Sequence, residues 1–390
     1  MDCISLYQIL IKFNKIIYNK WSLNINDYPT LPSLSFAIFR AHYLKDNNII
    51  QISGQIYNDI KQSYTGGAVD MYIPFNDKNE KIYSYDVNSL YPSIMKNSLM
   101  PVSNIHYFEG DIRSFDPEAF GYFYCKIKTP DQLNHPILQT HIKTNDGLRT
   151  VAALGSYEDM IFSYEMDNAI KLGYKFEILR GYTFKGEIIF EKIISDLYNL
   201  RKQYPKTEPM NYIAKILMNS LYGRFGMVDS FPDSIIINKK ELNSFLDKFS
   251  SSIIDIIDLD AQYLIQIKSI DNIDTLLDNS NENHNINIAI ASAITSYSRI
   301  FMSQFKNNSN YKLFYSDTDS ISNNKPLVDS LVNISELGKL KLENIADKAI
   351  FLAPKVYHFY CHHFYCHLFY FHLFYFHLYF HLQGHHQIQA

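Results

Sequence analysis

The sequence lacks several features that mark secreted or membrane-spanning proteins. Its 390 residues include only four cysteines, without the paired spacing of a zinc site, and no secretory signal peptide. The length and the cysteine count exclude a peptide hormone or a small disulfide scaffold and favour a reducing compartment. Histidines interrupt the apolar runs near the C-terminus well short of the roughly 18 residues that a membrane helix needs, so no membrane partner is expected.

Positive charge is also scarce. With 36 Lys and Arg against 40 Asp and Glu, the net charge of −4 provides no global basic field. A nucleic-acid partner would therefore have to be held by local Lys and Arg residues assisted by metal ions. What the chain does have is a 47% hydrophobic composition with many aromatic residues, 31 Tyr and 27 Phe against one Trp. This composition and length predict a globular protein of two or three structural units.

Hydrophobic periodicity predicts a mixture of helices and strands. The expected elements, in chain order, are an amphipathic core helix from Leu6 to Ile17, a second helix from Leu34 to Leu44, short strands over 119–190 with one helix near 157–171, two helices over 190–226 around Tyr204-Pro205, a strand-helix-strand region over 234–283, a buried helix from Ala289 to Phe305, and a hairpin from Lys312 to Ile321.

The chain changes character at His358. From there on, His, Phe, Tyr and Leu repeat at a period near five, which fits neither a strand nor a helix of a packed domain. Such repeats bind metal adventitiously, and no carboxylates accompany these histidines. We interpret the segment as repetitive translated sequence.

An acid follows an apolar stretch and precedes a tight turn in the segment from Tyr85 to Ile94, which reads Tyr-Asp-Val-Asn-Ser-Leu-Tyr-Pro-Ser-Ile. An acid at a strand end can hold a divalent cation. Taken alone, an Asp that caps a turn is the more common meaning of this pattern.

The segment from Lys215 to Gly226 reads Lys-Ile-Leu-Met-Asn-Ser-Leu-Tyr-Gly-Arg-Phe-Gly. At about 100° per residue, Lys215, Asn219 and Tyr222 lie along one helix face. That face would offer a cation, an amide and a ring to a triphosphate and a base. Taken alone, an ordinary amphipathic helix with a glycine stop explains the pattern better.

Two acids stand close together in the segment from Tyr315 to Ser320, which reads Tyr-Ser-Asp-Thr-Asp-Ser and predicts a hairpin with its turn around Asp317 and Thr318. Such acids repel unless water or a cation neutralises them, and a dication with oxygen ligands is the usual solution. A plain acidic turn and the Asp-x-Asp of metal-dependent glycosyltransferases are competing interpretations.

In this order, the three segments resemble motifs A, B and C of family B DNA polymerases. Two further segments add to the resemblance: Tyr64-Thr-Gly-Gly67 is similar to the Tyr-x-Gly-Gly between exonuclease and polymerase modules, and Lys355-Val-Tyr357 is similar to the Lys-x-Tyr at the end of the palm. The long separations between the motifs are similar to those of protein-primed members from phages and linear mitochondrial plasmids. The resemblance covers about residues 2–357.

The resemblance implies nucleotidyl transfer with two Mg²⁺ ions, or Mn²⁺ in their place. Its catalytic acids would be Asp86, Asp317 and Asp319. Asp86 and Asp319 would bridge the metal ions, the Val87 carbonyl would be a backbone ligand, and Asp317 would be an auxiliary acid.

The resemblance also implies contacts with substrate. Lys215 would neutralise the triphosphate, and Tyr91 would exclude a ribose 2′-hydroxyl. The residues implied to contact the deoxynucleotide are Val87, Ser89, Leu90, Tyr91, Arg201, Lys215, Asn219 and Tyr222. Those implied to contact DNA are Tyr64, Gly66 and Gly67 on the template and Lys355 and Tyr357 at the primer terminus.

The implied fold is of the α/β (α+β) class: a right-hand polymerase palm with an antiparallel sheet plus helical fingers, with the exonuclease domain and thumb largely absent. Asp2 would be a surviving exonuclease acid. The expected segments are 1–63, the end of an exonuclease domain with linker helices; 64–100, the palm start with Tyr-x-Gly-Gly and motif A; 101–190, a palm insertion similar to the terminal-protein region; 191–226, the fingers with motif B; 227–285, a second insertion; 286–357, the palm with motif C and Lys-x-Tyr; and 358–390, the His/aromatic tail.

The implied function is that of a DNA-directed DNA polymerase, a nucleotidyltransferase that extends a primer 3′-hydroxyl or a protein hydroxyl. Its partners would be primer-template DNA, deoxynucleoside triphosphates and a terminal priming protein, and its place a mitochondrion in which a linear plasmid replicates. The truncated ends leave open an alternative, a catalytically inactive polymerase remnant. A glycosyltransferase would leave the Tyr91 and Lys215 segments unexplained.

Overall fold

A computed structural model describes residues 2–44, 49–145, 147–226, 233–249, 253–267 and 287–360. Its α-helices are α1 (Asp2–Trp21), α2 (Leu31–His42), α3 (Gly54–Gln62), α4 (Leu90–Asn97), α5 (Ser163–Lys171), α6 (Glu191–Lys202), α7 (Pro209–Phe225), α8 (Leu242–Phe249) and α10 (Ile288–Lys306). Its strands are β1 (Val69–Met71), β2 (Ile82–Val87), β3 (Met100–Glu109), β4 (Gly121–Lys128), β5 (Gln139–Thr144), β6 (Gly147–Ala152), β7 (Ser156–Phe162), β8 (Lys175–Glu187), β9 (Asp233–Asn238), β10 (Ile253–Leu259), β11 (Gln262–Ile267), β12 (Leu313–Asp317), β13 (Ser320–Asn323), β14 (Leu340–Ala346), β15 (Lys348–Ala353) and β16 (Val356–Tyr360).

A five-stranded antiparallel sheet in the order β1-β12-β13-β2-β14 carries the acid-bearing segments. Strands β12 and β13 form the hairpin that the sequence predicts between Lys312 and Ile321. One face of the sheet is apolar: Tyr85, Val87 and Ile321 pack there against the C-terminal half of α10. Alternation along β2 therefore leaves Asp86 on the opposite face.

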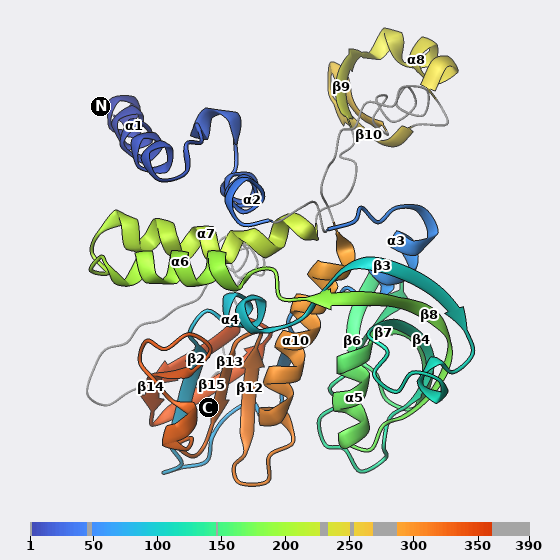
Figure 1. The fold of residues 1–390 in the computed structure, drawn as a ribbon, viewed down its shortest axis with the longest axis vertical. Helices are drawn as coiled ribbons and strands as arrows, with labels where there is room; N and C mark the ends of the chain where they lie inside the picture. The colour runs from blue at the N-terminus through green and yellow to red at the C-terminus, as the bar shows by residue number, and fades with distance from the viewer. Residues whose placement is uncertain are drawn as a thin grey trace, which may run out of the picture.

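Helix α10 runs between this sheet and a second, four-stranded sheet (Figure 1). Nearly every one of its side chains is buried, as the apolar pattern from Ala289 to Phe305 predicts. The Asn287 side chain caps its start by accepting a hydrogen bond from the Ile290 amide at 3.1 Å. Because α10 contacts α3, α4, α5 and α7, it fixes both sheets relative to the helices above them.

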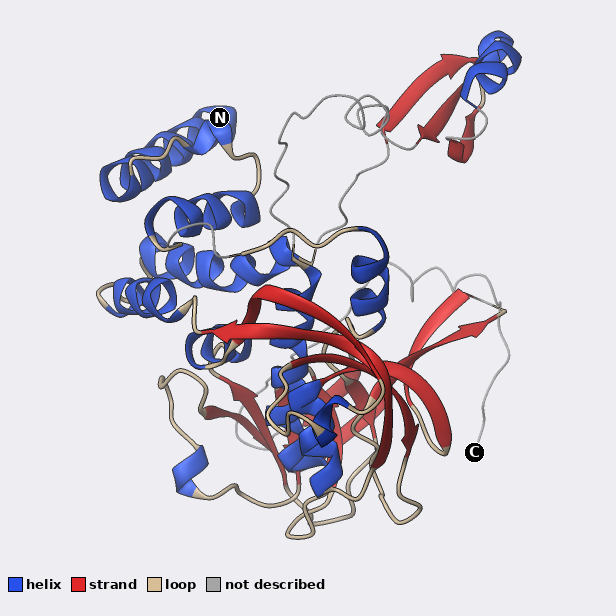
Figure 2. Ribbon diagram, turned by 45° about the vertical axis from the view of Figure 1, so that its right-hand side comes forward, coloured by secondary structure: helices blue, strands red, loops and turns tan. Residues whose placement is uncertain are grey.

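The second sheet has the order β3-β8-β4-β7 and curves around α5 (Figure 2). The prediction of one helix near 157–171 is wrong for the first half of that range. Residues 156–162 form strand β7, and only Ser163–Lys171 form helix α5. Strand β7 pairs with β4 along its whole length, from Ser156 opposite Lys128 to Phe162 opposite Tyr122. Long-range pairing has overridden the local helical pattern.

Helices α6 and α7 form the antiparallel pair that the sequence predicts around Tyr204-Pro205, and α2 packs on α7. Helix α2 begins earlier than predicted because Thr30 and Ser33 form a capping box at its start.

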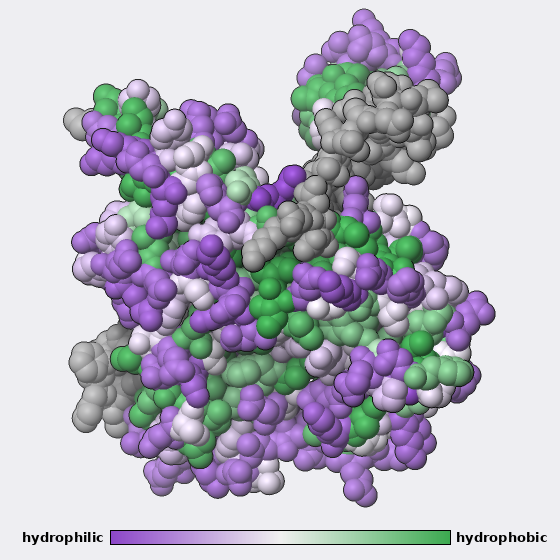
Figure 3. Space-filling view, viewed as in Figure 1, coloured by the Kyte–Doolittle hydropathy of each residue, from purple (hydrophilic) through white to green (hydrophobic). Residues whose placement is uncertain are grey.

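Helix α1 is present, but the expectation of a core helix is wrong for its first half. Its residue Ile17 is buried, whereas Ile4, Leu6 and Ile9 are 65%, 57% and 62% exposed. Hydrophobic surface is visible there at the upper left of Figure 3. Among the described residues of α1, only those of the second half contact the core: Ile17 and Trp21 belong to it, and Phe13 and Ile16 pack against it.

The remaining elements complete the described chain. Strands β9, β10 and β11 form a sheet that α8 accompanies, which is the strand-helix-strand pattern predicted over 234–283, although residues 268–286 lie outside the described part. Strand β16 continues past His358 to Tyr360 by pairing with β15, so the first residues of the predicted tail belong to the fold. Residues 361–390 lie outside the described part. Each described helix is too short or too polar to cross a bilayer.

Candidate active site

The ends of β2 and of the β12-β13 hairpin bring two acids together. Asp86 stands opposite Ser320 in the strand register, and the Val87 amide donates a hydrogen bond to the Asp319 carbonyl at 2.8 Å. The turn at Thr318 has a left-handed backbone, with φ of 52°. These backbone contacts place the Asp319 side chain beside Asp86, although the two residues are far apart in the sequence.

The two carboxylates disfavour each other's charge. Burial, followed by the charges of Asp319 and Glu343, raises the pKa of Asp86 to about 7, although Lys215 and Lys341 lower it in part. Burial also raises the pKa of Asp319 to about 6, with a contribution from Asp317. Two half-buried acids that repel each other form a site that a cation would stabilise.

Hard oxygen donors at this site suit Mg²⁺. Within the described ranges, no three His, Cys, Asp or Glu side chains form a metal-binding group. Mg²⁺ is nevertheless commonly bound by one or two carboxylates together with water and substrate phosphates. The carboxylates of Asp86 and Asp319 and the carbonyl of Val87 are the donors that the sequence predicts for this role, and they fit it chemically.

Asp317 has a different environment. The ammonium group of Lys355 lies 2.8 Å and 2.7 Å from its two carboxylate oxygens. The Lys355 amide also donates to the Tyr315 hydroxyl at 2.6 Å, and the Tyr357 ring lies 5.2 Å from that of Tyr315. The Lys-x-Tyr segment therefore packs against the acidic hairpin and neutralises one of its acids.

Helix α7 supplies a cation and a ring to the site. The charge of Lys215 lowers the pKa of both Asp86 and Asp319, so its ammonium group lies near them. Lys215 and Asn219 are exposed on α7, and Tyr222 is half-buried on the same helix. The rings of Tyr222 and Tyr91 lie 4.5 Å apart, which joins motif B to motif A.

The turn after β2 presents its backbone near these groups. Val87 and Leu90 are buried, and Ser89 between them has a left-handed backbone. The Arg201 guanidinium lies 3.5 Å from the Ser89 hydroxyl, at the limit of a hydrogen bond. Arg201, which the resemblance implies to contact the deoxynucleotide, thus lies beside the turn of motif A.

The Tyr-x-Gly-Gly segment bridges the hairpin and α7. A Cβ atom on Gly67 would lie 2.6 Å from the Thr318 side chain, so only glycine fits against the acidic turn. The Tyr64 hydroxyl approaches Gly226 closely, just beyond the end of α7, and burial, followed by the neighbouring Tyr222, raises the Tyr64 pKa. Gly66 has open space around it.

A buried ion pair that the sequence does not reveal holds this segment. Arg299 of α10 pairs with Glu165 of α5 through two 2.7 Å contacts, and both side chains are nearly inaccessible to solvent. Arg299 also donates to the carbonyls of Thr65 at 2.8 Å and Gly66 at 3.3 Å. An Arg within an apolar helix is a sequence signal for a buried partner, but the pattern cannot identify Glu165.

Changing Glu165 to Gln should lower the free energy of unfolding by about 3 kcal/mol, because Arg299 would keep a buried charge without its counter-ion. Urea unfolding measures this change. The matched control is Glu177→Gln, whose ion pair with Lys126 is exposed and should contribute at most about 1 kcal/mol. Similar small losses in both variants would contradict a supporting role for the pair.

Glu343 is a second residue of this site that the sequence pattern does not reveal. It lies on β14, where Lys341 stands opposite Asp86, and its charge raises the Asp86 pKa. The ammonium group of Lys341 lies 2.6 Å from the Glu343 carboxylate and partly offsets its effect on the Asp86 pKa. A Lys-x-Glu alternation in an edge strand carries no distinctive signal, so only the sheet order reveals that Glu343, like Asp317, is a further acid near the pair.

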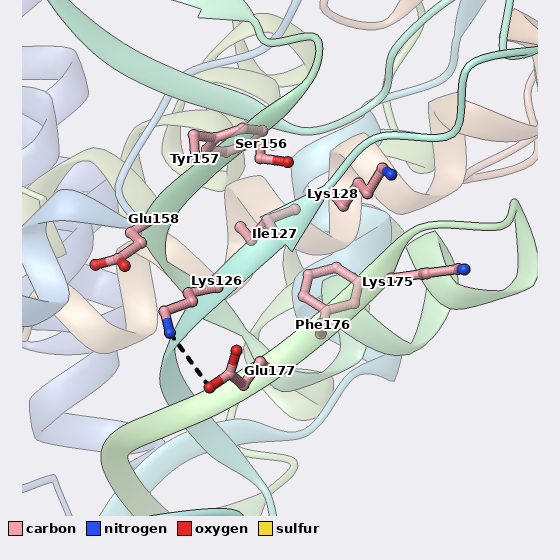
Figure 4. A pocket seen from close by; sticks show the side chains of 9 residues that line it. All are labelled: Lys126, Ile127, Lys128, Ser156, Tyr157, Glu158, Lys175, Phe176 and Glu177. Atoms are coloured by element: carbon pink, nitrogen blue, oxygen red, sulfur yellow. Dashed lines mark hydrogen bonds and ion pairs between the residues drawn. The ribbon is translucent and has the colours of Figure 1, made fainter.

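A hollow of about 400 Å³ lies elsewhere, over β4, β7 and β8 (Figure 4). Its lining includes Lys128, Lys175 and the exposed pair of Lys126 and Glu177. None of its lining residues belongs to the motif segments. The acids at the ends of β2 and β12 therefore remain the candidate site.

Known proteins of one kind match most of this chain. It is 39% identical over 365 residues to a probable DNA polymerase of Neurospora intermedia, and the match covers 92% of this chain and 36% of that protein. It is 36% identical to a probable DNA polymerase of Ascobolus immersus, with 92% and 29% covered. A DNA polymerase of Streptococcus phage Cp-1 is 26% identical, with 72% and 46% covered. The chain thus spans about a third of the length of these fungal relatives.

The fold is similar to that of phi29 DNA polymerase. The structure of that enzyme with single-stranded DNA superposes with a TM-score of 0.64 at 17% identity, covering 88% of this chain and 56% of that one. Its ternary complex with primer-template DNA and incoming nucleotide gives 0.62 at 19% identity, covering 87% and 56%. Residues 1–311 match the family model described as DNA polymerase type B, organellar and viral. This chain belongs to that family.

Proposed function

We propose that this chain is a DNA-dependent DNA polymerase module that adds deoxynucleotides to a primer 3′-hydroxyl. One observation supports the proposal: strand pairing and the 2.8 Å hydrogen bond from the Val87 amide to the Asp319 carbonyl hold two motif acids together, and the charge of Lys215 from a third motif lowers the pKa of both Asp86 and Asp319. Two acids and a cation that converge in this way suit a triphosphate with bound metal ions. Membership of the type B family supports the same reaction.

Asp86 and Asp319 would hold two Mg²⁺ ions together with the Val87 carbonyl. When bound, these ions would activate the primer hydroxyl and stabilise the pyrophosphate leaving group. Lys215 would neutralise charge on the triphosphate, with Arg201 in support. Asp317, whose charge Lys355 already balances, would act as an auxiliary acid.

The remaining assigned residues would select and hold substrates. Tyr91, packed on Tyr222, would occupy the space of a 2′-hydroxyl, while Asn219 would check the nascent base pair. The backbone around Ser89 and Leu90 would face the triphosphate. The segments proposed to contact DNA are Tyr64, Gly66 and Gly67 on the template and Lys355 and Tyr357 at the primer end.

Finer assignments rest on the family resemblance and the fungal relatives. We propose priming from the hydroxyl of a terminal protein, and replication of a linear plasmid in a mitochondrion. The seven segments defined from the sequence, including the exonuclease end at 1–63 and the insertion at 101–190, are part of the same proposal.

Primer extension with the purified chain tests the proposed function. A labelled primer annealed to a longer template, with four deoxynucleotides and Mg²⁺ or Mn²⁺, should yield products lengthened by template-directed addition. Omitting one deoxynucleotide should stop synthesis at the corresponding template position. A folded protein that extends no primer with either metal would instead support an inactive remnant.

A further inference from the structure

We propose that the loop between β13 and β14, residues 324–339, clamps the turn of motif A, and that Asn88 is the positioning residue through which it acts. The turn, residues 87–90, is the backbone that the proposed function places against the nucleotide triphosphate. The inference therefore rests on that function, and it concerns how the turn keeps its shape.

The turn has a conformation that must be held by its surroundings. Ser89 precedes α4 with φ of 55° and ψ of 68°, in the left-handed region. A residue with a Cβ atom disfavours this region by about 1 kcal/mol or more, and no side-chain cap hydrogen bond compensates at this helix start. Contacts from outside the turn are therefore needed to keep its backbone in place.

The loop supplies these contacts at Asn88. The Asn88 amide donates to the Lys339 carbonyl at 2.9 Å, and the Gly338 amide donates to the Asn88 carbonyl at 3.0 Å. The Asn88 side chain donates to the Asn333 carbonyl at 2.8 Å. One residue of motif A thus engages the loop with both of its backbone groups and its side chain, next to Ser89.

The loop is itself braced. The Asn333 side chain accepts from the Ser335 and Glu336 amides, both at 2.9 Å. The Lys339 ammonium group donates to the Ser330 carbonyl at 2.6 Å. A loop with its own internal hydrogen bonds can transmit a fixed position to the turn.

The same loop reaches the fingers helix α6. The Tyr198 hydroxyl donates to the Ser335 carbonyl. One turn later on α6, Arg201 lies 3.5 Å from the Ser89 hydroxyl. The loop therefore ties the motif A turn to the helix that carries a cation proposed for the triphosphate, and it should set the distance between them.

Changing Asn88 to Ala removes the side-chain donor and leaves the Asn333 carbonyl without it. We expect the KM for deoxynucleotide in single-nucleotide incorporation to rise about tenfold, as for a lost hydrogen bond to a half-buried group, with a much smaller change in kcat. Tyr198→Phe should raise KM in the same direction, and the double variant should be less than additive because both changes act through one loop. A purely structural role would lower kcat by reducing the folded fraction and leave KM unchanged.

Asn76→Ala is the matched control, because its side chain donates to the Asp347 carbonyl at 3.0 Å at the other end of the same sheet. It should leave KM unchanged. An unaltered KM in Asn88→Ala, with an active wild type, would overturn the clamp and leave the polymerase assignment intact.

Hydrogen exchange separates the clamp from the activity. The backbone amides at positions 88 and 338 should exchange faster in Asn88→Ala than in the wild type, and not in Asn76→Ala. If the wild type extends no primer, the proposed function fails while exchange still decides the clamp. Unchanged exchange in Asn88→Ala would overturn the clamp in that case.

Discussion

Changing Asp86 to Asn should reduce primer extension by about a thousandfold or more. The carboxylate is one of two proposed to hold the metal ions, and losing several kcal/mol of transition-state stabilisation slows a reaction tenfold for each ~1.4 kcal/mol. Asp319→Asn should have an effect of the same size. Single-turnover extension of a labelled primer measures both variants.

The matched control is Asp77→Asn, since that acid is exposed and forms only a 3.4 Å ion pair with Lys312 in the same part of the chain. It should extend primers like the wild type. Full activity in Asp86→Asn and Asp319→Asn would remove both residues from the site.

The fold itself should survive these changes. The pKa of Asp86 rises from 3.8 to about 7 in the folded chain, so the folded state binds its proton more tightly than the unfolded state. Without metal ions, stability should therefore fall as the pH rises through this window, and the fall should be smaller in Asp86→Asn. Urea unfolding at several pH values, with and without Mg²⁺, measures both slopes. A fall as steep in Asp86→Asn as in the wild type would contradict the raised pKa.

Changing Tyr91 to Val should weaken discrimination against ribonucleotides by about a hundredfold, because the lost ring would no longer occupy the space of a 2′-hydroxyl. The ring packs on Tyr222, and its phenol pKa is raised by burial and then by Tyr222 and Asp319, which places it between α7 and the acids. The ratio of kcat/KM for a deoxynucleotide to that for its ribonucleotide is the measurement.

Two variants make the sugar test specific. Tyr91→Phe keeps the ring and should keep discrimination, whereas Tyr212→Val removes an exposed ring from α7, the helix that carries Tyr222, and should change nothing. If Tyr91→Val discriminates like the wild type, Tyr91 is a packing residue between motifs A and B.

Features that depend on neighbours along the chain could be predicted from the amino-acid sequence. The hairpin with two acids was predictable because a tight turn with flanking apolar residues is decided within about six positions. The face of α7 that carries Lys215, Asn219 and Tyr222 follows from helical spacing alone. The family could be predicted from the residues of the motif segments and their order along the chain, because both can be compared without a structure.

Contacts between residues far apart in the sequence depend on the folded arrangement of the strands and helices. Glu343 stands near Asp86 because β14 pairs with β2, and Glu165 meets Arg299 across 134 positions of sequence. The loop proposed to clamp Asn88 is likewise distant in the sequence, since Asn88 and its partner Asn333 are 245 positions apart. Local pattern carries no information about such partners.

Whether an apolar face is buried also depends on tertiary contacts. The pattern of α1 predicts an apolar face, but Ile4 and Leu6 are exposed because none of the described elements packs there. Residues 156–162 became strand β7 because β4 offered a complete row of hydrogen-bond partners. The spacing of apolar residues shows which of them share one face of a helix or strand. The contacts made by the folded chain determine whether that face is buried.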